Sequence, residues 1–468
     1  MAVAPVSKSN VAIVGAGASG ILLANALVRS GMPIDVTLID PKPGRGIAYG
    51  SADPHYLLNT RAGNMSIDAP DRSGFVDWLN IHRSDQKRWT EEDFAPRAAF
   101  GDYLEQRLSD LVNRTPGLGS TRVASGRAVA AERAGDGWIV RTDAGDRIPA
   151  DVLVLATGLA RPRPLLFHGR EAVEGFIQDD PWDEATPTAA SLGEAVLLVG
   201  SGLTALDVAC SIWRRRPKTR VIALSRHGLL PRVHASPPAS APVLQPPYPA
   251  TARELFSRLR AATEFVEGDA SLRHGVFLGL REIAADVWAA LPDDERLAFL
   301  RHFRRYWEVE RHRVPPLQAA VLRHAMSEGR FEVVKGRLAE GKASTDGLSA
   351  RVALLTPQGP RALAVSRVIN CAGPEPDPFR SRNALLLDLL AQGAAAADPL
   401  GLGLHVDNAS AAIGSRGEPT PGLFALGALT QGRFFEITAV AEIRLQAERL
   451  ADLILSGQAV QPARAAND

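Results

Sequence analysis

The sequence predicts an α/β fold in which one strand–turn–helix unit occurs twice. Residues 11–20 read VAIVGAGASG and residues 195–205 read AVLLVGSGLTA. Each stretch opens with apolar residues typical of a buried parallel strand, continues into a glycine-rich turn, and is followed by apolar residues at helical spacing. Residues 251–328 are rich in helical patterns and poor in strand patterns, which indicates a mostly helical insert.

The composition is that of an ordinary globular protein large enough for two or three domains. The chain has 468 residues, of which 46% are hydrophobic and 22% charged, and its net charge is +1. Such a balance gives no indication of a nucleic acid partner. The apolar stretch from Val11 to Val28 contains three glycines and Asn25, which favours a strand–turn–helix over a membrane span.

Cysteine usage and the first ten residues favour a cytoplasmic location. Residues 1–10 lack the apolar core of a signal peptide. The two cysteines, Cys210 and Cys371, lie far apart, so no disulfide framework and no C-x-x-C dithiol is expected. Because the histidines also lack the spacing of metal ligands, we expect no metal site.

The first glycine-rich turn has the G-x-G-x-x-G spacing of a dinucleotide-binding site. Gly15 permits the tight turn after the strand, Gly17 lets the backbone approach a pyrophosphate, and Gly20 lets the helix pack on the strand. Ser19 falls in the first helical turn, where free N–H groups and a partial positive charge face the phosphates. We therefore expect phosphate contacts from Gly15 to Gly20.

An acidic residue at the next strand end supports this interpretation. The apolar strand expected at residues 35–39 ends in Asp40, twenty residues after Gly20, where a carboxylate accepts a hydrogen bond from an adenosine ribose. The alternative, a glycine-rich turn in some other α/β protein, does not account for Asp40.

The remainder of the first unit is expected to complete a sheet around this turn. Residues 41–66 form an extended segment that either lines the ligand or is a surface connection. A small-residue turn, Ala156-Thr157-Gly158, would let the chain pass close under the dinucleotide. The other predicted elements are short helices at 75–79 and 100–111 and a β-meander at 123–131, 138–142 and 151–155.

The second glycine-rich turn carries Gly200, Gly202 and Ala205 in the G-x-G-x-x-A form of the same motif. The strand that follows, at residues 220–224, ends in Ser225-Arg226-His227 rather than in an acid. Since an arginine at this position suits a 2′-phosphate, NADP(H) is favoured over NAD(H). The alternative is a solvated arginine at the edge of the sheet.

Two such units in one chain imply two nucleotides, the plan of flavoproteins that hold FAD in the first unit and NAD(P)H in the second. The predicted fold class is therefore α/β, with two Rossmann-like dinucleotide-binding domains of the three-layer ββα flavoprotein type. The FAD-binding domain is expected at 1–165 and 366–468, and the NAD(P)H-binding domain at 190–365, with the helical insert at about 235–330.

The tail and the insert supply further candidate residues. A strand, a glycine turn at Gly427 and a helix from about Ile437 would form the third part of a flavin site, with the helix N-terminus facing the flavin. Cys371 lies in a turn that repeats the pattern of 156–158, and it is interpreted as a packing residue. A basic cluster in the insert could hold an anion, although such clusters are more often solvated helix faces: Arg301, Arg304, Arg305, Arg311 and Arg313.

The assembled motifs resemble a family of bacterial FAD/NAD(P)-binding proteins, two-dinucleotide flavoproteins, over nearly the whole chain. More distantly, the order of motifs is similar to that of the flavin monooxygenases that N-hydroxylate ornithine and lysine. The segments that carry the resemblance are Gly46–Gly50, Leu57–Asn59, Met65-Ser66, Ser225–Pro231, Trp307–Pro316 and Phe435–Arg444.

This resemblance implies roles for individual residues. Gly15, Gly17, Gly20 and Asp40 would bind the ADP half of FAD. Asn59 and Met65 would lie near the isoalloxazine, and Gly200, Gly202 and Arg226 would hold NADPH. One departure is that many such flavoproteins have an aspartate in the tail for the ribityl chain, where this chain has Gly427-Ala428, so the contact there would come from the backbone.

The function expected on these grounds is that of an FAD- and NAD(P)H-dependent oxidoreductase, a monooxygenase of a small nucleophilic, amine-like substrate. Two alternatives share the motifs: a reductase passing electrons to a quinone or protein partner, and a non-catalytic flavin-binding redox sensor. The missing dithiol argues against a disulfide reductase. No side chain stands out as a catalyst, because the cofactor carries the chemistry. Homo-oligomerisation is left open.

Overall fold

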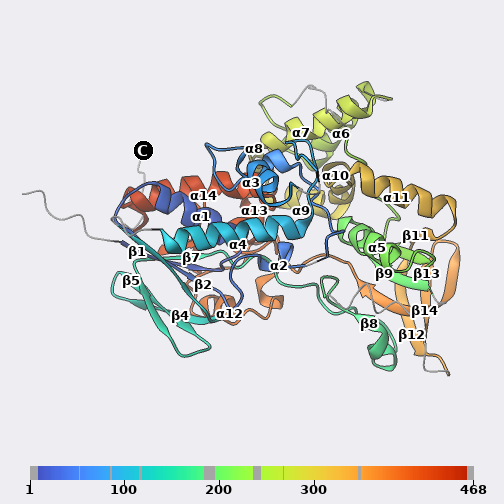
Figure 1. Ribbon diagram of the computed structural model, residues 1–468, viewed down its shortest axis with the longest axis horizontal. Coiled ribbons are helices and arrows are strands. Elements are labelled where there is room, and N and C mark those ends of the chain that lie inside the picture. The colour runs from blue at the N-terminus through green and yellow to red at the C-terminus, as the bar shows by residue number, and fades with distance from the viewer. Residues whose placement is uncertain are drawn as a thin grey trace, which may run out of the picture.

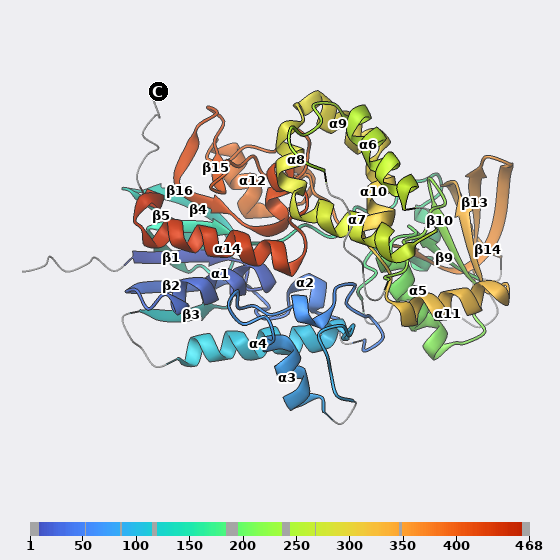
Figure 2. The same ribbon diagram turned by 90° about the horizontal axis from the view of Figure 1, so that it is seen from above.

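The computed structural model describes residues 9–51, 53–84, 87–114, 119–183, 195–235, 244–266, 268–345 and 349–460. Residues 1–8, most of the segment on which the expectation about a signal peptide rests, lie outside the described part. Residues 184–194, the end of a linker at 161–194 that the sequence predicts from its Pro, Asp and Glu content, also lie outside it. Two sheets lie at opposite ends of the molecule, and the helical insert bridges them (Figures 1 and 2).

The first sheet has six strands in the order β15–β16–β7–β1–β2–β3. All neighbours are parallel except β15, which is antiparallel to β16. The strands β1, β2 and β7 are almost fully buried apolar runs, because both faces of the sheet are covered. The bounds are β1 (Ser9–Val14), β2 (Ile34–Ile39), β3 (Ser120–Ala124), β7 (Val152–Leu155), β15 (Ala411–Ile413) and β16 (Pro419–Ala425).

Helices and a small sheet cover the two faces of this first sheet. Helices α1 and α14 pack together on one face, with α4 beside them (Figure 2). On the other face, a three-stranded antiparallel sheet and α12 form a second core around Trp138. The bounds are α1 (Ala18–Arg29), α3 (Gly74–His82), α4 (Arg97–Asn113), β4 (Ala128–Ala134), β5 (Gly137–Thr142), β6 (Arg147–Ala150), α12 (Ala384–Ala391) and α14 (Val440–Leu455). This is the predicted three-layer ββα arrangement.

The second sheet has the order β11–β10–β9–β14–β13–β12, with β8 beside β14. Helices α5 and α11 cover one of its faces, and a core around Val173 lies on the other. The strand β14 continues to Asn370, so residues 366–370 lie within this sheet. The bounds are β8 (Ile177–Gln178), β9 (Ala195–Val199), α5 (Leu203–Arg215), β10 (Val221–Ser225), α11 (Pro316–Ser327), β11 (Phe331–Lys335), β12 (Arg337–Ala343), β13 (Ala350–Thr356) and β14 (Gly359–Asn370).

The insert is helical, as its sequence pattern predicts. Its own apolar core also takes in Leu402 and Phe435 from the C-terminal part of the chain. Trp288 Nε1 donates a 2.8 Å hydrogen bond to Gly432 O at the same junction. The insert is therefore packed against the first domain and not only against the second. Its helices are α6 (Ala252–Phe265), α7 (Ala270–Glu282), α8 (Ala284–Ala290), α9 (Asp293–His302) and α10 (Arg304–Arg311).

Several predicted element boundaries are wrong. The single strand expected at 123–131 is two strands in different sheets, β3 and β4, and the strands β6 and β12 were not predicted. A short, half-exposed strand alternates apolar and polar residues over only a few positions. Its sequence pattern is therefore weak, and such strands are easily missed or merged with their neighbours. The segment at 41–66 is also not purely extended, since Gly46–Tyr49 forms the short helix α2 and Ala62–Asn64 a 3₁₀ turn.

Candidate functional site

The first glycine turn, residues 15–20, is packed too closely for a side chain at Gly15 or at Gly20. Gly15 has a φ of +109°, and a Cβ on it would overlap Ala156 O and lie 3.2 Å from Thr157 Cα. A Cβ on Gly20 would overlap Gly15 O, so the helix α1 could not pack onto the turn. The 156–158 turn therefore lies directly against Gly15, while its place under the dinucleotide stays a prediction.

The loop after β2 folds over Gly17. A Cβ on Gly17 would lie 3.3 Å from Gly46 Cα, and Gly44 N donates to Ala16 O at 2.8 Å. The N-terminal turn of α1 has no side-chain cap, so its N–H groups meet no capping side chain. Main-chain donors at an uncapped helix N-terminus, in a cradle of glycines, fit the pyrophosphate of a dinucleotide.

Asp40 lies beside this turn and is held by the backbone. Its Oδ2 accepts a hydrogen bond from Ala16 N at 2.9 Å and its Oδ1 one from Lys42 N at 2.8 Å. A carboxylate has lone pairs for about four hydrogen bonds, so both oxygens can still accept a ribose hydroxyl. The acid expected from the sequence thus lies next to the glycine turn with its orientation fixed.

The tail approaches the same helix through Gly427. A Cβ on Gly427 would lie 2.6 Å from Ser19 Oγ, so only glycine lets these segments come together. Gly427 N donates to Gln446 Oε1 at 2.9 Å, and Gly427 O accepts from Thr430 Oγ1 at 2.8 Å. The backbone groups of Gly427 are thus engaged within the chain, and its contribution is close approach rather than a spare N–H.

The C-terminal helix α14 begins at Val440, not at about Ile437 as the sequence pattern predicts. Phe435 has a φ of 55°, and Glu436 N donates to Phe434 O at 2.7 Å, which closes a γ-turn. This turn ends the short helix α13 (Gln431–Phe434) and delays the next helix. Ile437 lies in the connection with its side chain buried in the core that also contains Met65.

The second glycine turn repeats the geometry of the first. Gly200 has a φ of +129°, and a Cβ on it would overlap Cys371 O, as one on Gly15 would overlap Ala156 O. Gly202 has open space around it and caps α5 without a side-chain hydrogen bond. The expected echo of the 156–158 turn at 370–373 is therefore present. Ser201 Oγ lies 2.8 Å from Ser225 Oγ, which joins the turn to the end of β10.

Arg226 is exposed at the end of β10, and further basic residues lie nearby. Lys335 on β11 pairs with Ser225 on β10. A Cβ added to Gly228 would lie 3.1 Å from the Cβ of Lys335, so this lysine is close to the segment that follows Arg226. Burial lowers the pKa of the His227 imidazole, and the positive charges of Arg305, Arg226 and Lys335 lower it further. The expected arginine thus lies in a positively charged part of the second domain.

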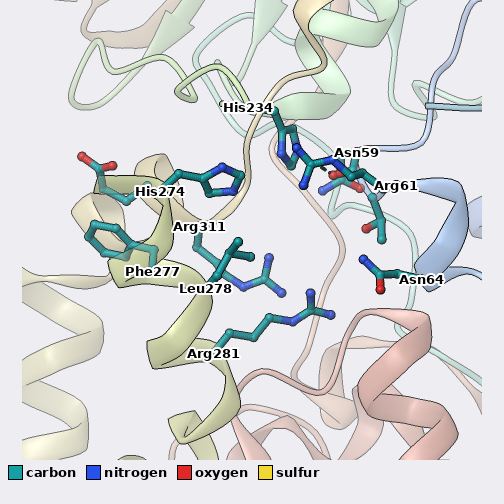
Figure 3. Close-up of a pocket in the computed structure, with 11 residues that line it drawn as sticks. Asn59, Arg61, Asn64, His234, His274, Phe277, Leu278, Arg281 and Arg311 are labelled. Atoms are coloured by element: carbon teal, nitrogen blue, oxygen red, sulfur yellow. Dashed lines mark hydrogen bonds between the residues drawn. The ribbon is translucent and has the colours of Figure 1, made fainter. Parts of the chain in front are cut away.

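A cavity opens where the segment 59–64 of the first domain meets helices α7 and α10 of the insert (Figure 3). Asn59, a predicted site residue, lines this cavity, whereas Met65 is 2% exposed and packs in the core. The residues that line the cavity are Asn59, Thr60, Arg61, Asn64, His234, His274, Phe277, Leu278, Arg281, Glu310 and Arg311.

Two arginines of the cavity are tied to the start of the C-terminal helix. Arg281 forms a bidentate ion pair with Glu442 in the first turn of α14. Arg311 Nε lies 2.8 Å from Glu436 Oε2. Burial alone would raise the pKa of the Glu436 carboxyl, but Arg311 and His312 outweigh it and hold this pKa below its usual value. Both pairs connect the insert to the first domain.

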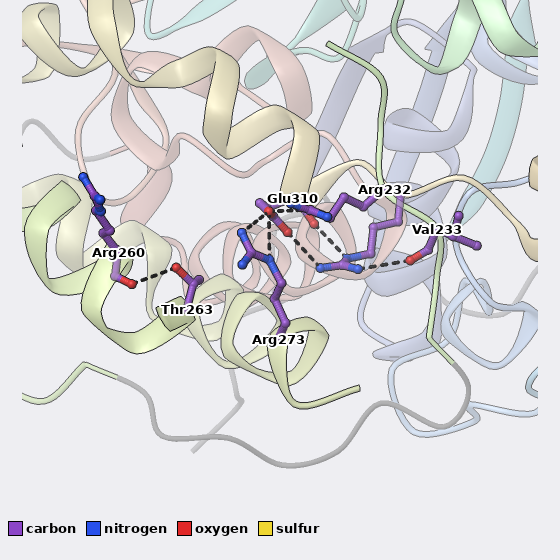
Figure 4. A network of polar contacts seen from close by, with 7 residues as sticks. Arg232, Val233, Arg260, Thr263, Arg273 and Glu310 are labelled. Atoms are coloured by element: carbon purple, nitrogen blue, oxygen red, sulfur yellow. Dashed lines mark hydrogen bonds and ion pairs between the residues drawn. The ribbon is translucent and has the colours of Figure 1, made fainter. Parts of the chain in front are cut away.

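Glu310 is the centre of a separate network of arginines (Figure 4). Its Oε1 accepts from Arg232 Nε at 2.7 Å and from Arg273 Nη2 at 2.5 Å, and its Oε2 lies 3.2 Å from Arg313 Nη2. Burial would raise the pKa of Glu310, but the hydrogen bonds from Arg273 and Arg232 lower it below the usual value. Glu310 is therefore an anion fully engaged by its neighbours.

The two histidines of the cavity are neutral. His234 Nε2 donates to Asn59 O at 2.9 Å, and its ring lies 5.2 Å from that of His274. Burial lowers the pKa of His234 to about 3 and that of His274 to about 4, and nearby arginines contribute to both shifts. The Nδ1 atoms of both rings are buried and have no hydrogen-bond partner within the described part of the chain.

The predicted basic cluster of the insert is divided by the fold. Arg311 and Arg313 are buried with glutamate partners, while Arg304 pairs with Glu308 one turn along its helix and Arg301 is exposed. Sequence reasoning did not single out Arg61, His234, His274, Arg281, Glu310 or Glu436. Glu310 and Glu436 fall in segments that carry the family resemblance, whereas Arg281 and His274 have no sequence signal beyond a helical pattern.

The two cysteines are buried thiols. Burial raises the pKa of Cys210 to about 12, with Asp207 adding to the shift, and burial also raises the pKa of Cys371. Neither is therefore a thiolate at neutral pH. Among the described residues, no helix combines the length and the apolar composition that crossing a membrane requires.

Comparisons with known proteins agree with this architecture. Residues 12–160 match a family model described as FAD-NAD(P)-binding. Comparison with curated proteins gives no significant match.

Similar solved structures are flavoproteins of low sequence identity. The structure of an ornithine N-hydroxylase from Kutzneria sp. 744, with reduced FAD, NADP⁺ and L-ornithine, is 17% identical, with a TM-score of 0.62 over 97% of this chain and 100% of that one. L-lysine 6-monooxygenase from Pseudomonas syringae is 19% identical, with a TM-score of 0.63 over the same shares. Bacillithiol disulfide reductase from Bacillus cereus is 13% identical, with a TM-score of 0.55 over 96% of this chain and 100% of that one.

The fold is thus shared by enzymes of different activities, and these likenesses define architecture rather than reaction. The two glycine turns occupy matching positions in the two sheets, and the family match covers the first of them. The family match and the structure thus agree on a dinucleotide-binding unit in this part of the chain. Residues 12–160 match the FAD-NAD(P)-binding family model, and the chain as a whole has the Rossmann-like, two-domain fold seen in these flavoprotein structures.

Proposed function

We propose that this protein holds FAD on its first glycine turn and is an NAD(P)H-dependent oxidoreductase, a monooxygenase of a small amine-like substrate. The observation that carries this proposal is the cavity lined both by the segment 59–64 of the first domain and by helices of the insert. A second layer of structure over this space would shield a reacting centre from water, which oxygen transfer requires.

The chain's own residues would bind and orient the cofactor. The amides of the first glycine turn would hold the pyrophosphate, and Asp40 would accept a hydrogen bond from the adenosine ribose. Asn59 would face the reacting part of the flavin, and the uncapped N-terminus of α14 would stabilise negative charge there. Bound FAD supplies hydride acceptance and oxygen chemistry, so no catalytic side chain is required.

Gly200 and Gly202 would hold the pyrophosphate of the nicotinamide nucleotide. Arg226 would contact its 2′-phosphate, since it lies exposed at the strand end where such a contact is made. Lys335 and Arg305 add positive charge near this position, which supports NADPH as the preferred nucleotide.

The likeness to ornithine and lysine hydroxylases supports an amine as the group that is oxygenated, whereas the buried cysteines give no support to a thiol reaction. The deciding experiment follows NADPH oxidation by the FAD-loaded protein with a panel of small amines. It measures oxygenated product and hydrogen peroxide in the same samples. We expect product to form in step with NADPH consumption for at least one amine. Peroxide alone with every amine would contradict oxygen transfer, and absence of NADPH oxidation would contradict the oxidoreductase assignment.

A further inference from the structure

A buried polar junction, separate from the cavity described above, joins the second domain to the first. Its centre is Asp207, which is 2% exposed and lies on α5 of the second domain. Asp207 Oδ2 accepts a hydrogen bond from Arg97 Nε at 3.3 Å, and Arg97 is the first residue of α4 in the first domain. Asp207 Oδ1 accepts from Gln318 Nε2 of α11 at 2.6 Å. One buried carboxylate thus connects three helices of the two domains.

A second contact of this junction lies one helical turn further along α5. The Ser211 side chain is fully buried, and its hydroxyl donates a hydrogen bond to Asp53 Oδ2 of the first domain. The other oxygen of Asp53 accepts from His55 N at 2.9 Å, which fixes the direction of the carboxylate. Two successive turns of α5 are therefore bound to the first domain by buried hydrogen bonds, which have a defined geometry that apolar contact lacks.

Arg97 is itself held in place on the side of the first domain. Its backbone N–H donates to Tyr56 O at 2.7 Å, and its guanidinium group lies 5.6 Å from the centre of the Trp182 ring, over the face of the indole. The rings of Tyr56 and Trp182 meet edge to face with their centres 5.4 Å apart. The backbone and an aromatic ring therefore fix the arginine that Asp207 binds.

The junction lies close, along the chain, to both predicted nucleotide sites. Asp207 is in the second turn of α5, and Gly202 of the second glycine turn caps this helix. On the other side, Tyr56 comes shortly before Asn59, which lines the cavity where the flavin is proposed to react. Because close-packed elements transmit displacements, a shift at Asp207 would move the second glycine turn relative to the segment that carries Asn59.

We infer that Asp207 is a positioning residue for hydride transfer from the nicotinamide nucleotide to the flavin. In that step the C4–H bond of NADPH breaks, and its hydrogen and electron pair pass to the flavin, so NADPH is oxidised and the flavin reduced. The rate depends steeply on the separation and orientation of the reacting groups, which the junction sets through Arg97 and Gln318. The inference rests on the proposed function and adds a residue that acts from outside both glycine turns.

Hydrogen exchange of the FAD-loaded protein, without NADPH, tests the junction itself. Asp207→Ala removes the carboxylate that joins the domains. We expect the amides of Arg97 and His55 to exchange about tenfold faster or more, since a hydrogen bond between charged groups is lost beside them. The amide of Val140, in the small sheet of the first domain, should exchange as in the unmodified protein. Unchanged exchange at Arg97 and His55 would overturn the inference.

Anaerobic stopped-flow reduction of the flavin by NADPH tests the positioning role. At saturating NADPH, we expect Asp207→Ala to be reduced about tenfold more slowly or worse, because small misplacements of reacting groups cost this much. The Kd for NADP⁺, measured by calorimetry, should change little, because the glycine turns are intact. Asp207→Asn should restore most of the rate, since asparagine can accept from Arg97 and donate to a flipped Gln318 amide. An unchanged rate, or a change in Kd alone, would overturn the inference.

Val352→Ala is the matched control for a general loss of stability. Val352 is 1% exposed on β13, in the core on the face of the second sheet away from α5. This variant should lower the free energy of unfolding without slowing flavin reduction. Equal slowing in Val352→Ala and Asp207→Ala would assign the effect to lost stability and overturn the inference.

Retention of FAD and binding of NADP⁺ show that both domains of each variant are folded. If Asp207→Ala does not fold, Ser211→Ala removes the neighbouring contact of the same junction, and the same outcomes decide. If NADPH fails to reduce the flavin of the unmodified protein, the proposed function is contradicted, and the role of Asp207 in hydride transfer falls with it. Hydrogen exchange would still show whether Asp207 holds the two domains together.

Discussion

Trp307 and Glu436 meet at the junction between the helical insert and the first domain, where the indole Nε1 donates a 2.6 Å hydrogen bond to Glu436 Oε1. The other carboxylate oxygen lies 2.8 Å from Arg311 Nε. Glu436 follows the strained turn at Phe435 and precedes helix α14. One carboxylate thus holds an insert helix against the start of the helix expected to face the flavin.

Glu436→Gln should therefore loosen the insert. Glutamine can still accept from Trp307, but Arg311 would be left buried without a counter-charge, which costs about 3 kcal/mol in the free energy of unfolding. Urea unfolding followed by tryptophan fluorescence measures the loss. Glu264→Gln, which removes an exposed pair with Arg260, should leave this free energy nearly unchanged. If the two variants lowered the free energy of unfolding equally, the pair between Glu436 and Arg311 would stabilise the protein no more than an exposed pair does.

Gly17→Val should prevent the protein from retaining FAD. The side chain would press on Gly46, whose Cα would lie 3.3 Å from the first added carbon, and would fill the space for the phosphates. The measurement is the flavin absorbance and the identity of the nucleotide released from purified protein. Gly175→Val, at an exposed glycine with open space around it, should retain FAD. Full occupancy in Gly17→Val, or release of FMN, would refute the assignment.

Arg226→Ala should reduce the preference for NADPH. Loss of one hydrogen bond between charged groups should reduce the stabilisation of the transition state with NADPH by about 1.5–3 kcal/mol. The reaction with NADH should change little, because NADH lacks the 2′-phosphate. The ratio of kcat/KM for NADPH and NADH checks this. Lys218→Ala, at an exposed position before β10, serves as the control. An unchanged ratio in Arg226→Ala would remove this residue from the site.

His274 should make the protein less stable in acid. Its pKa is about 4 in the folded protein against 6.5 for an ordinary histidine, so the unfolded chain takes up a proton first as the pH falls. The stability is complete above about pH 6.5 and is lost progressively as the pH falls towards 4. His274→Asn should lose about 1–2 kcal/mol less than the unmodified protein between about pH 7 and 5.

Urea unfolding at both pH values measures the difference for His274. His324→Asn is the control, because His324 is exposed and pairs with Glu328 one helical turn away. If His274→Asn loses as much free energy of unfolding in acid as the unmodified protein, the assignment of His274 as a neutral residue is wrong.

The cysteines should be dispensable for flavin reduction. Both thiols are buried with raised pKa values, so neither is poised as a nucleophile. Cys210→Ala combined with Cys371→Ala should keep the rate at which NADPH reduces the flavin, measured by stopped-flow absorbance. In the unmodified protein, thiol labelling should modify neither cysteine in the folded state and both cysteines in urea. Loss of reduction with FAD still bound would indicate thiol chemistry after all.

The sequence by itself determined the two glycine turns, their strands and helices, and the acid after β2. These are local signals, because each motif lies within a continuous strand–turn–helix whose spacing reflects close backbone packing. The repeated small-residue turns at 156–158 and 370–373 were also predictable, since each follows an apolar strand. The start of α14 was not, because the γ-turn at Phe435 depends on aromatic packing against Trp288 of the insert.

Only the tertiary structure decided which charged residues of the insert meet. Arg281 and Glu442 are 161 residues apart, and Trp307 and Glu436 are 129 apart. In the sequence, Arg311 and Arg313 could not be distinguished from the solvated arginines of the same cluster. Their burial depends on partners brought by other segments, since a charge enters the interior only where a distant chain segment supplies its counter-charge.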